Sequence, residues 1–319
     1  MNNPWKEIKA PVKDVSALRI NPDHPLDLYW AMDHIGRYLF IYEYPSDSDI
    51  IINNPPDLEG IEIVSTLAVN NNSRLVLILK EKENWELFLA LCNDLLSSTI
   101  RIKSSIVGSS TILQRLRRWH EFLKKKRLDI LSEEKIKGLI GELLFIKNHL
   151  VSKYDIIDAI KFWIGPEGAP QDFNINNCAV EVKCQLGSTK PSVQISSVDQ
   201  LFSQLPKLFL FVVTLGKSTV DNMNSLSLPF LISEINEYLK NESDCLNQFQ
   251  DKLMEVGYFY SNKYLDYNYI LSDEHVYNVK DSFPRICPDD LKQGIIKLTY
   301  NIALAECSPY EINIANWEF

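Results

Sequence analysis

Apolar and polar residues in the first part of the chain follow a strand-like pattern. β-Branched and aromatic runs, separated by polar turn sequences, predict strands at 38–44, 60–66 and 74–80. From residue 83 onward, apolar residues recur at helical spacing and predict helices at 83–96, 111–125 and 134–150. We therefore expect residues 1–100 to form a β-rich region that ends in a helix.

Residues 134–216 combine both patterns. After the helix at 134–150, the pattern predicts a strand at 159–164, a hairpin at 172–185, a strand at 192–196 and a helix at 198–204. Ser197, with Gln200 three residues later, predicts a capping box that opens this last helix. Leu208–Leu215 is continuously apolar, which is typical of a strand buried on both faces of a sheet. The expected fold class is α/β, mixed α+β overall, with its core in residues 101–220.

The last hundred residues are expected to form an α+β extension over 221–319. Helices are predicted at 229–239 and 244–254, and strands at 257–260, 275–279 and 295–303. The chain therefore divides into a β-rich region, a core preceded by a basic helix, and this extension.

Composition excludes several classes of protein. Six cysteines without a C-x-x-C pair are too sparse for a disulfide scaffold, and five scattered histidines make a structural zinc site unexpected. Every apolar run is far shorter than the ~20 residues that span a bilayer, and the N-terminal residues lack the layout of a secretory signal. We expect a cytoplasmic protein without a membrane partner.

Positive charge is concentrated in one segment of an acidic chain. The net charge is −9, yet residues 101–127 hold nine basic side chains and one acidic one. Most of the basic side chains lie opposite the apolar stripe of the predicted helix at 111–125. Because salt screens distant repulsion within ~10 Å, this segment can attract phosphate locally. The alternative interpretation is a solvated helix face.

The hairpin at 172–185 holds the candidate chemistry. Asn176–Asn177 is a plausible two-residue turn, because asparagine tolerates the positive φ that tight hairpins need. With this turn Phe173 pairs with Val180, and Asp172 lies opposite Glu181. Strand alternation then places Lys183 on the same face as Glu181.

Two carboxylates and a lysine on one patch of a sheet are unusual, because like charges that face each other destabilise a sheet by up to about 1 kcal/mol. A divalent cation between Asp172 and Glu181 would relieve this repulsion, and Mg²⁺ prefers such oxygen ligands. Lys183 would then hold an attacking water or neutralise charge on a phosphate. The alternative is an exposed hairpin face on which glutamate and lysine pair without function.

These residues resemble the motif of the PD-(D/E)XK nuclease superfamily. An aspartate at the start of a hairpin, here Asp172, is followed by Glu-x-Lys on the next strand, here Glu181-Val182-Lys183. Glu142, in the upstream segment GLIGELLFI, matches the acidic residue that the superfamily takes from a preceding helix. The segments W-x-GP, VQISSVDQL and FPRI are further similar to a bacterial family of PD-(D/E)XK proteins encoded among restriction and phage-defence genes. The literal Pro-Asp is absent, because Gln171 precedes the aspartate.

The resemblance implies a restriction-endonuclease-like core, a central mixed sheet flanked by helices, and a role for each residue of the motif. Asp172 and Glu181 would bind the metal with help from the carbonyl of Val182, and Lys183 would orient or activate water. Glu142 would assist the metal or the water, and the alternative for it is a boundary glutamate paired with a lysine. The neighbouring Gly138 and Gly141 predict close packing of this helix against a neighbour.

Three further residues are candidates for contact with nucleic acid. Gln200 matches a position where superfamily members place a polar active-site group, and its alternative role is helix capping. Arg115 and Arg118 lie in the basic segment and are candidates for phosphate contacts.

The function expected from these residues is that of a Mg²⁺-dependent endonuclease acting on DNA in restriction or phage defence. Mn²⁺ is expected to substitute for Mg²⁺, and RNA as a substrate, a homodimer and partner proteins of a defence system stay open. One alternative is a non-catalytic nucleic-acid-binding or assembly subunit of a defence system. Another is an interaction scaffold unrelated to nucleic acid, which the acidic composition favours.

Overall fold

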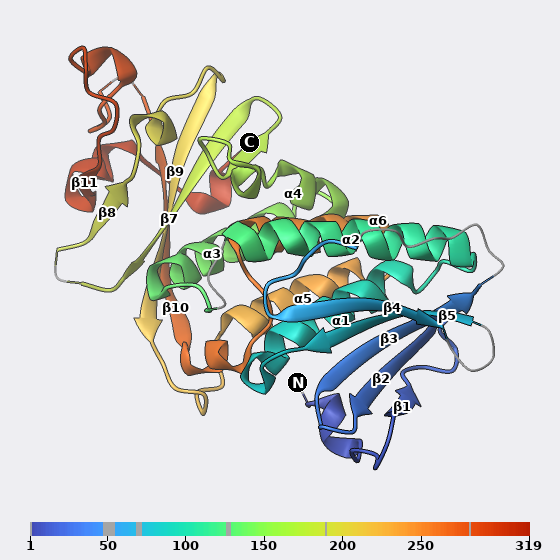
Figure 1. Cartoon of the computed structure of the whole chain (residues 1–319). Helices are drawn as coiled ribbons and strands as arrows, with labels where there is room; N and C mark the ends of the chain where they lie inside the picture. Colours follow the sequence, from blue (N-terminus) through green and yellow to red (C-terminus); the bar gives the residue numbers. More distant parts are fainter. Residues whose placement is uncertain (1, 47–54, 68–71, 126–128, 189, 281) are drawn as a thin grey trace. The chain divides into compact units, whose positions relative to one another are not determined.

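The computed structural model describes the chain except residues 1, 47–54, 68–71, 126–128, 189 and 281 (Figure 1). Two compact units are present. The first comprises Met1–Ile130 and Phe259–Asn262, and the second comprises Leu131–Tyr258 and Lys263–Phe319. In the part of the chain that is described, no helix is long and apolar enough to cross a membrane.

The first unit is built on a five-stranded antiparallel sheet of order β1-β2-β3-β5-β4. Its strands are β1 (Val15–Arg19), β2 (Asp27–Asp33), β3 (Tyr38–Pro45), β4 (Ile61–Leu67) and β5 (Asn72–Leu79). Two helices follow in the sequence, α1 (Trp85–Thr99) and α2 (Ser105–Lys125). Trp5 is fully buried, stacks on Phe88 of α1 and donates its indole N–H to the carbonyl of Leu39 at 2.8 Å. These contacts join the sheet to the helix in one hydrophobic core.

The second unit contains a mixed five-stranded sheet of order β12-β10-β9-β7-β6. Its strands are β6 (Phe173–Ile175), β7 (Cys178–Leu186), β9 (Lys207–Lys217), β10 (Tyr269–Asn278) and β12 (Glu311–Ile312). Strand β7 runs parallel to β9, and the other pairs are antiparallel. A second, two-stranded sheet pairs β8 (Ser192–Ile195) with β11 (Tyr300–Ala303). The mixed α/β fold predicted from the sequence is confirmed.

One helix of this unit packs on a face of the mixed sheet, and further helices pack beside it. These helices are α3 (Glu133–Phe145), α4 (Ile156–Phe162), α5 (Leu228–Leu239) and α6 (Ser243–Val256), and α3 continues into a π-helical turn at Ile146–Leu150. Gly141 of α3 lies against β7, where an added Cβ would stand 3.3 Å from Cβ of Cys184. The close packing predicted from the glycines is therefore present at Gly141, whereas an added Cβ at Gly138 would meet nothing within 4 Å. The opposite face of the sheet packs on β8 and β11 through a cluster that includes Leu210, Ile195 and Ile302.

Several predicted elements differ from the structure. Residues 159–164 were expected to form a strand, yet Ile156–Phe162 is the helix α4, because Asp155 caps it by accepting the N–H of Asp158 at 2.8 Å. The expected strand at 257–260 is absent from these described residues, and β1 and β2 lie where no strand was expected.

The expected helix at 198–204 is a shorter 3₁₀ turn, η5 (Val198–Leu201). Its capping box is also absent among the described contacts, since Ser197 accepts the N–H of Asp199 and the side chain of Gln200 points elsewhere. The units also differ from the division expected at residues 100 and 220. Helix α2 belongs to the first unit, and most of residues 221–319 belong with the hairpin to the second unit.

Candidate active site

The hairpin of β6 and β7 has the predicted register. Phe173 pairs with Val180 and Ile175 with Cys178, so that Asn176 and Asn177 form the turn. Asn176 has a φ of 55°, the left-handed conformation for which asparagine is suited.

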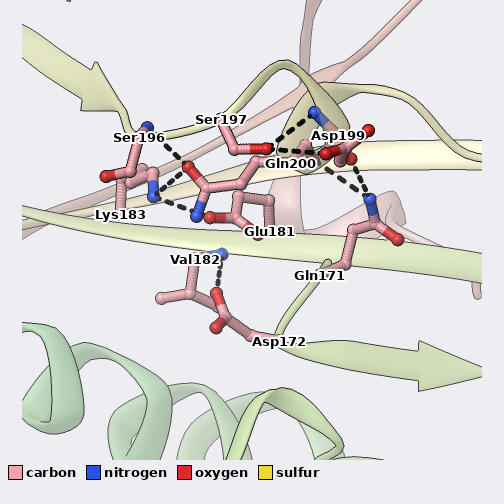
Figure 2. Close-up of polar contacts among 9 residues, drawn as sticks. All are labelled: Gln171, Asp172, Glu181, Val182, Lys183, Ser196, Ser197, Asp199 and Gln200. Carbon is pink, nitrogen blue, oxygen red and sulfur yellow. Dashed lines mark hydrogen bonds and ion pairs between the residues drawn. The ribbon is translucent and has the colours of Figure 1, made fainter. Parts of the chain in front are cut away.

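Asp172 stands immediately before β6, and hydrogen bonds hold both its backbone carbonyl and its side-chain carboxylate. Its carbonyl accepts the N–H groups of Ile164 at 2.8 Å and Gly165 at 2.9 Å. Its carboxylate accepts the backbone N–H of Val182 at 2.8 Å (Figure 2). At Gly165 an added Cβ would lie 2.9 Å from the Asp172 Oδ1 atom, so glycine leaves the space that the carboxylate occupies. These contacts direct the Asp172 carboxylate toward β7.

Glu181 and Lys183 form a largely buried ion pair on one face of β7, the face predicted from strand alternation. The Lys183 ammonium lies 2.6 Å from Glu181 Oε1. The side chain of Lys183 is 16% exposed and that of Glu181 is 1% exposed. The other carboxylate oxygen, Oε2, is buried and has no hydrogen-bond partner among the described residues. A buried acceptor without a donor costs about 1–3 kcal/mol, and more when it is charged. The surface pair without function, considered as the alternative, does not describe this environment.

Gln200 reaches Lys183 from the η5 turn. Its Oε1 atom accepts the Lys183 ammonium at 3.1 Å and the backbone N–H of Ser196 at 2.8 Å (Figure 2). The sequence placed Gln200 near the site, and the structure brings it onto the lysine of the motif. Its expected contact with nucleic acid stays a prediction.

Glu142 of α3 belongs to the same cluster. Its Oε2 atom accepts the indole N–H of Trp163 at 2.6 Å. Burial raises the pKa of the Glu142 carboxyl well above its usual range, and the nearby Asp172 carboxylate adds to this rise. The lysine partner that the alternative interpretation required is not its hydrogen-bond donor in the described chain. The partner is Trp163, which is itself fully buried.

The electrostatics of the cluster are those of three acids that share one cation. Burial raises the pKa of Asp172 to about 6, against the opposing effects of Lys183 and the Val182 N–H. Burial and the Asp172 charge also raise the pKa of Glu181 well above its usual range, although Lys183 opposes the rise. With one lysine for three carboxyls, the site favours an additional positive charge.

The residues present fit a divalent metal ion that takes two carboxylate ligands from the protein. Mg²⁺ commonly takes one or two carboxylates and completes its shell with water and substrate. Asp172 and Glu181 suit this preference, and one Glu181 oxygen has no hydrogen-bond partner in the described part of the chain. The backbone of Val182 lies between them in sequence, and its N–H is already bonded to Asp172. In the described ranges, no cluster of three or more His, Cys, Asp or Glu side chains has a metal-binding arrangement. A metal here would therefore depend on two protein carboxylates.

Arg115 has a different environment from the one predicted. It is 6% exposed, and its guanidinium pairs with Asp94 of α1 in the first unit, with Nε 2.9 Å from Oδ2. The expectation that Arg115 contacts phosphate is thus corrected, because its guanidinium is buried in a bidentate pair. Arg118 is exposed on α2, as Arg117 and Lys124 are, and its contact with phosphate stays a prediction.

Three residues around the site were not identified from the sequence. Trp163 was noted only within the segment W-x-GP and Gln171 only as a departure from the motif, whereas both hydrogen-bond to site elements. Lys252 of α6 is 8% exposed, donates to the carbonyl of Trp163 and pairs with Glu167 at 2.8 Å. Only Gln171, next to Asp172, had a sequence signal that could have identified it.

Comparison with known families agrees with the motif. Residues 1–305 match the family model described as "Putative PD-(D/E)XK family member, (DUF4420)". The search of the curated proteins and the search of the solved structures returned no match. Because the model covers nearly the whole sequence, the chain belongs to this PD-(D/E)XK family, whose description indicates a nuclease-like fold.

Proposed function

We propose that this member of the PD-(D/E)XK family is a Mg²⁺-dependent endonuclease that hydrolyses phosphodiester bonds in DNA, with a role in restriction or phage defence. The observation that carries the proposal is the buried Oε2 atom of Glu181, which has no hydrogen-bond partner among the residues described and lies near Asp172 and the Lys183 ammonium. A site that serves only as structure has no need of this uncompensated acid.

Each residue has a distinct task in this reaction. Asp172 and Glu181 would hold the metal, with the Val182 carbonyl as a third oxygen. A bound Mg²⁺ would polarise the phosphodiester and lower the pKa of a water molecule. Lys183 donates hydrogen bonds, so it orients the attacking water or the scissile phosphate and stabilises negative charge that develops there. Glu142, held by Trp163, lies within electrostatic range of Asp172 and is suited to accept or hold a proton near the metal ligands.

Cleavage of supercoiled plasmid and phage DNA in Mg²⁺ or Mn²⁺ tests the proposal, with a single-stranded RNA as a parallel substrate. Lys183→Ala is expected to abolish cleavage. Lys161→Ala is the matched control, because Lys161 also pairs with an acid, Asp158, but is 58% exposed. Equal cleavage by Lys183→Ala and the wild-type protein would contradict the mechanism.

A second measurement does not depend on catalysis. If Asp172 and Glu181 bind Mg²⁺, the ion stabilises the folded state by about 1.4 kcal/mol at ten times its dissociation constant. The melting temperature is then expected to rise with Mg²⁺ in the wild-type protein and to stay constant in Glu181→Gln. Binding of DNA without cleavage, with no stabilisation by metal, would instead favour the non-catalytic nucleic-acid-binding subunit.

A further inference from the structure

Gln171 connects two parts of the candidate site that are distant in sequence. It is 9% exposed, and its Nε2 amide lies within hydrogen-bond distance of three backbone carbonyls of one turn. The distances are 2.5 Å to Asp199, 3.4 Å to Gln200 and 2.9 Å to Phe202, and Figure 2 shows the amide reaching this turn.

The turn needs such donors. The last residues of a short 3₁₀ helix leave carbonyl groups without partners inside the helix, and a buried carbonyl without a donor is costly. The η5 turn (Val198–Leu201) has no following helix to supply these donors. The two N–H groups of the Gln171 amide are shared among the carbonyls of Asp199, Gln200 and, just after the turn, Phe202. The Asp199 carbonyl also accepts the Phe202 N–H at 3.2 Å, and Arg285 donates its Nη1 to the carbonyl of Leu201 at 2.6 Å.

This turn carries the side chain that holds the lysine. Gln200 lies within η5, and its Oε1 atom accepts the Lys183 ammonium, which also pairs with Glu181. Gln171 directly precedes Asp172 in the sequence. These two consecutive residues therefore supply a candidate metal ligand and the side chain that hydrogen-bonds to the turn.

We propose that Gln171 is a positioning residue for the reaction: it fixes the η5 turn so that Gln200 holds Lys183 against Glu181. This inference rests on the proposed nuclease function and deepens it. A proline, which the motif name places here, has no side-chain donor and could not make these bonds. Glutamine in place of the proline of the motif therefore supplies the hydrogen bonds to the η5 turn.

Steady-state kinetics of DNA cleavage test the inference in the full-length protein. Gln171→Met keeps the length of the side chain and removes the amide. It is expected to lower kcat about 10- to 100-fold, the usual effect of losing a partner that orients a functional group, with KM changed less than about twofold. Gln250→Met is the matched control, because the Gln250 amide bonds to Asn236, between α6 and α5, and is expected to leave both constants unchanged.

A double-mutant cycle identifies the route of the effect. If Gln171 acts through Gln200, Gln171→Met is expected to change kcat little once Gln200 is alanine. Full additivity of the two substitutions, or an unchanged kcat in Gln171→Met, would overturn the inference while the nuclease function stands.

Amine labelling of Lys183, measured by peptide mass spectrometry, gives a readout without cleavage. In Gln171→Met the labelling of Lys183 is expected to rise relative to the exposed Lys161, and amide exchange is expected to quicken in residues 196–202. If the wild-type protein does not cleave, the proposed function fails by itself. Labelling and exchange identical in the wild-type and variant proteins would then refute the positioning role separately.

Discussion

Two largely buried carboxylates, Asp94 in the first unit and Glu181 in the second, meet their cationic partners in different ways. Asp94 receives Arg115 through both oxygens, and its Oδ2 atom also accepts the indole N–H of Trp119 at 2.8 Å. Glu181 receives Lys183 through one oxygen only, and its second oxygen has no donor in the described chain.

The difference separates a structural ion pair from a site prepared for a ligand. At Asp94 both carboxylate oxygens accept hydrogen bonds, and a guanidinium balances the charge. Around Glu181, two more acids, Asp172 and Glu142, raise its pKa together with burial, and one lysine does not compensate them. The four predictions that follow test this distinction, in order of decreasing expected effect.

Replacement of Glu181 by glutamine is expected to have the largest effect. The change keeps the shape of the side chain and removes a metal ligand, so DNA cleavage in Mg²⁺ should fall on the order of 10⁴-fold, which corresponds to about 5.5 kcal/mol in the barrier. The rate of plasmid nicking measures this loss. Retention of more than a tenth of the wild-type rate would mean that Glu181 is as structural as Asp94.

Arg115→Met is expected to destabilise the protein by about 3–5 kcal/mol, because it leaves the buried Asp94 without its cation. Urea unfolding followed by tryptophan fluorescence measures the change. Arg117→Met, on the exposed side of the same helix, is the control and should change the free energy of unfolding by less than about 0.5 kcal/mol. Equal stability of the two variants would show that the ion pair of Asp94 and Arg115 does not stabilise the fold.

Asp172→Asn is expected to stabilise the metal-free protein above pH 6. In the folded wild-type protein the pKa of Asp172 is about 6, above the ordinary value of 3.8, so the folded state keeps a proton that the unfolded state releases. The contribution of Asp172 to the free energy of unfolding is therefore kept in full below about pH 4. It declines as the pH rises to about 6, by up to about 3 kcal/mol. Asparagine does not titrate and avoids this decline.

Melting temperatures in excess EDTA between pH 4 and pH 8 measure the effect of Asp172→Asn. The two proteins are expected to melt alike at pH 4 and to diverge at higher pH. A parallel pair of curves would show that Asp172 is not held in an acidic cluster. Glu142 and Glu181 titrate in the same cluster, so the double variant Asp172→Asn, Glu181→Gln should show a flatter pH profile than either single variant.

The two tryptophans give the smallest effects. Trp119→Phe and Trp163→Phe each remove one indole donor from a buried acid and are expected to cost about 1 kcal/mol in stability. Only Trp163→Phe should also lower the rate of DNA cleavage, since Glu142 then loses its orienting donor. A loss of cleavage in Trp119→Phe without unfolding would contradict the division between the two sites.

Local patterns predicted much of the site. The Asn176–Asn177 turn fixed the register of the hairpin, and strand alternation then put Glu181 and Lys183 on one face. Both inferences depend on residues within twelve positions of one another. The placement of Glu142 and Gln200 followed from a resemblance to a known family, and the structure brings both into the cluster.

What the sequence did not predict depends on contacts between distant segments. Gln171 bonds to a turn 28 to 31 residues away, and Trp163 bonds to a residue 21 positions before it. Arg115 was a candidate for phosphate contact because it lies in the basic segment, but the partner that buries it, Asp94, comes from another helix. The helix α4 was mistaken for a strand because short apolar runs suit either element.

The absence of a side chain at Gly165 links the evolution of two positions. A methyl group there would lie 2.9 Å from Oδ1 and 3.1 Å from Cα of Asp172, so a mutation to alanine would displace this residue. Among homologous chains, glycine at this position is then expected wherever an acid follows seven residues later. A larger residue at the first position should accompany loss of the acid at the second, so that the pair marks which relatives have kept a working site.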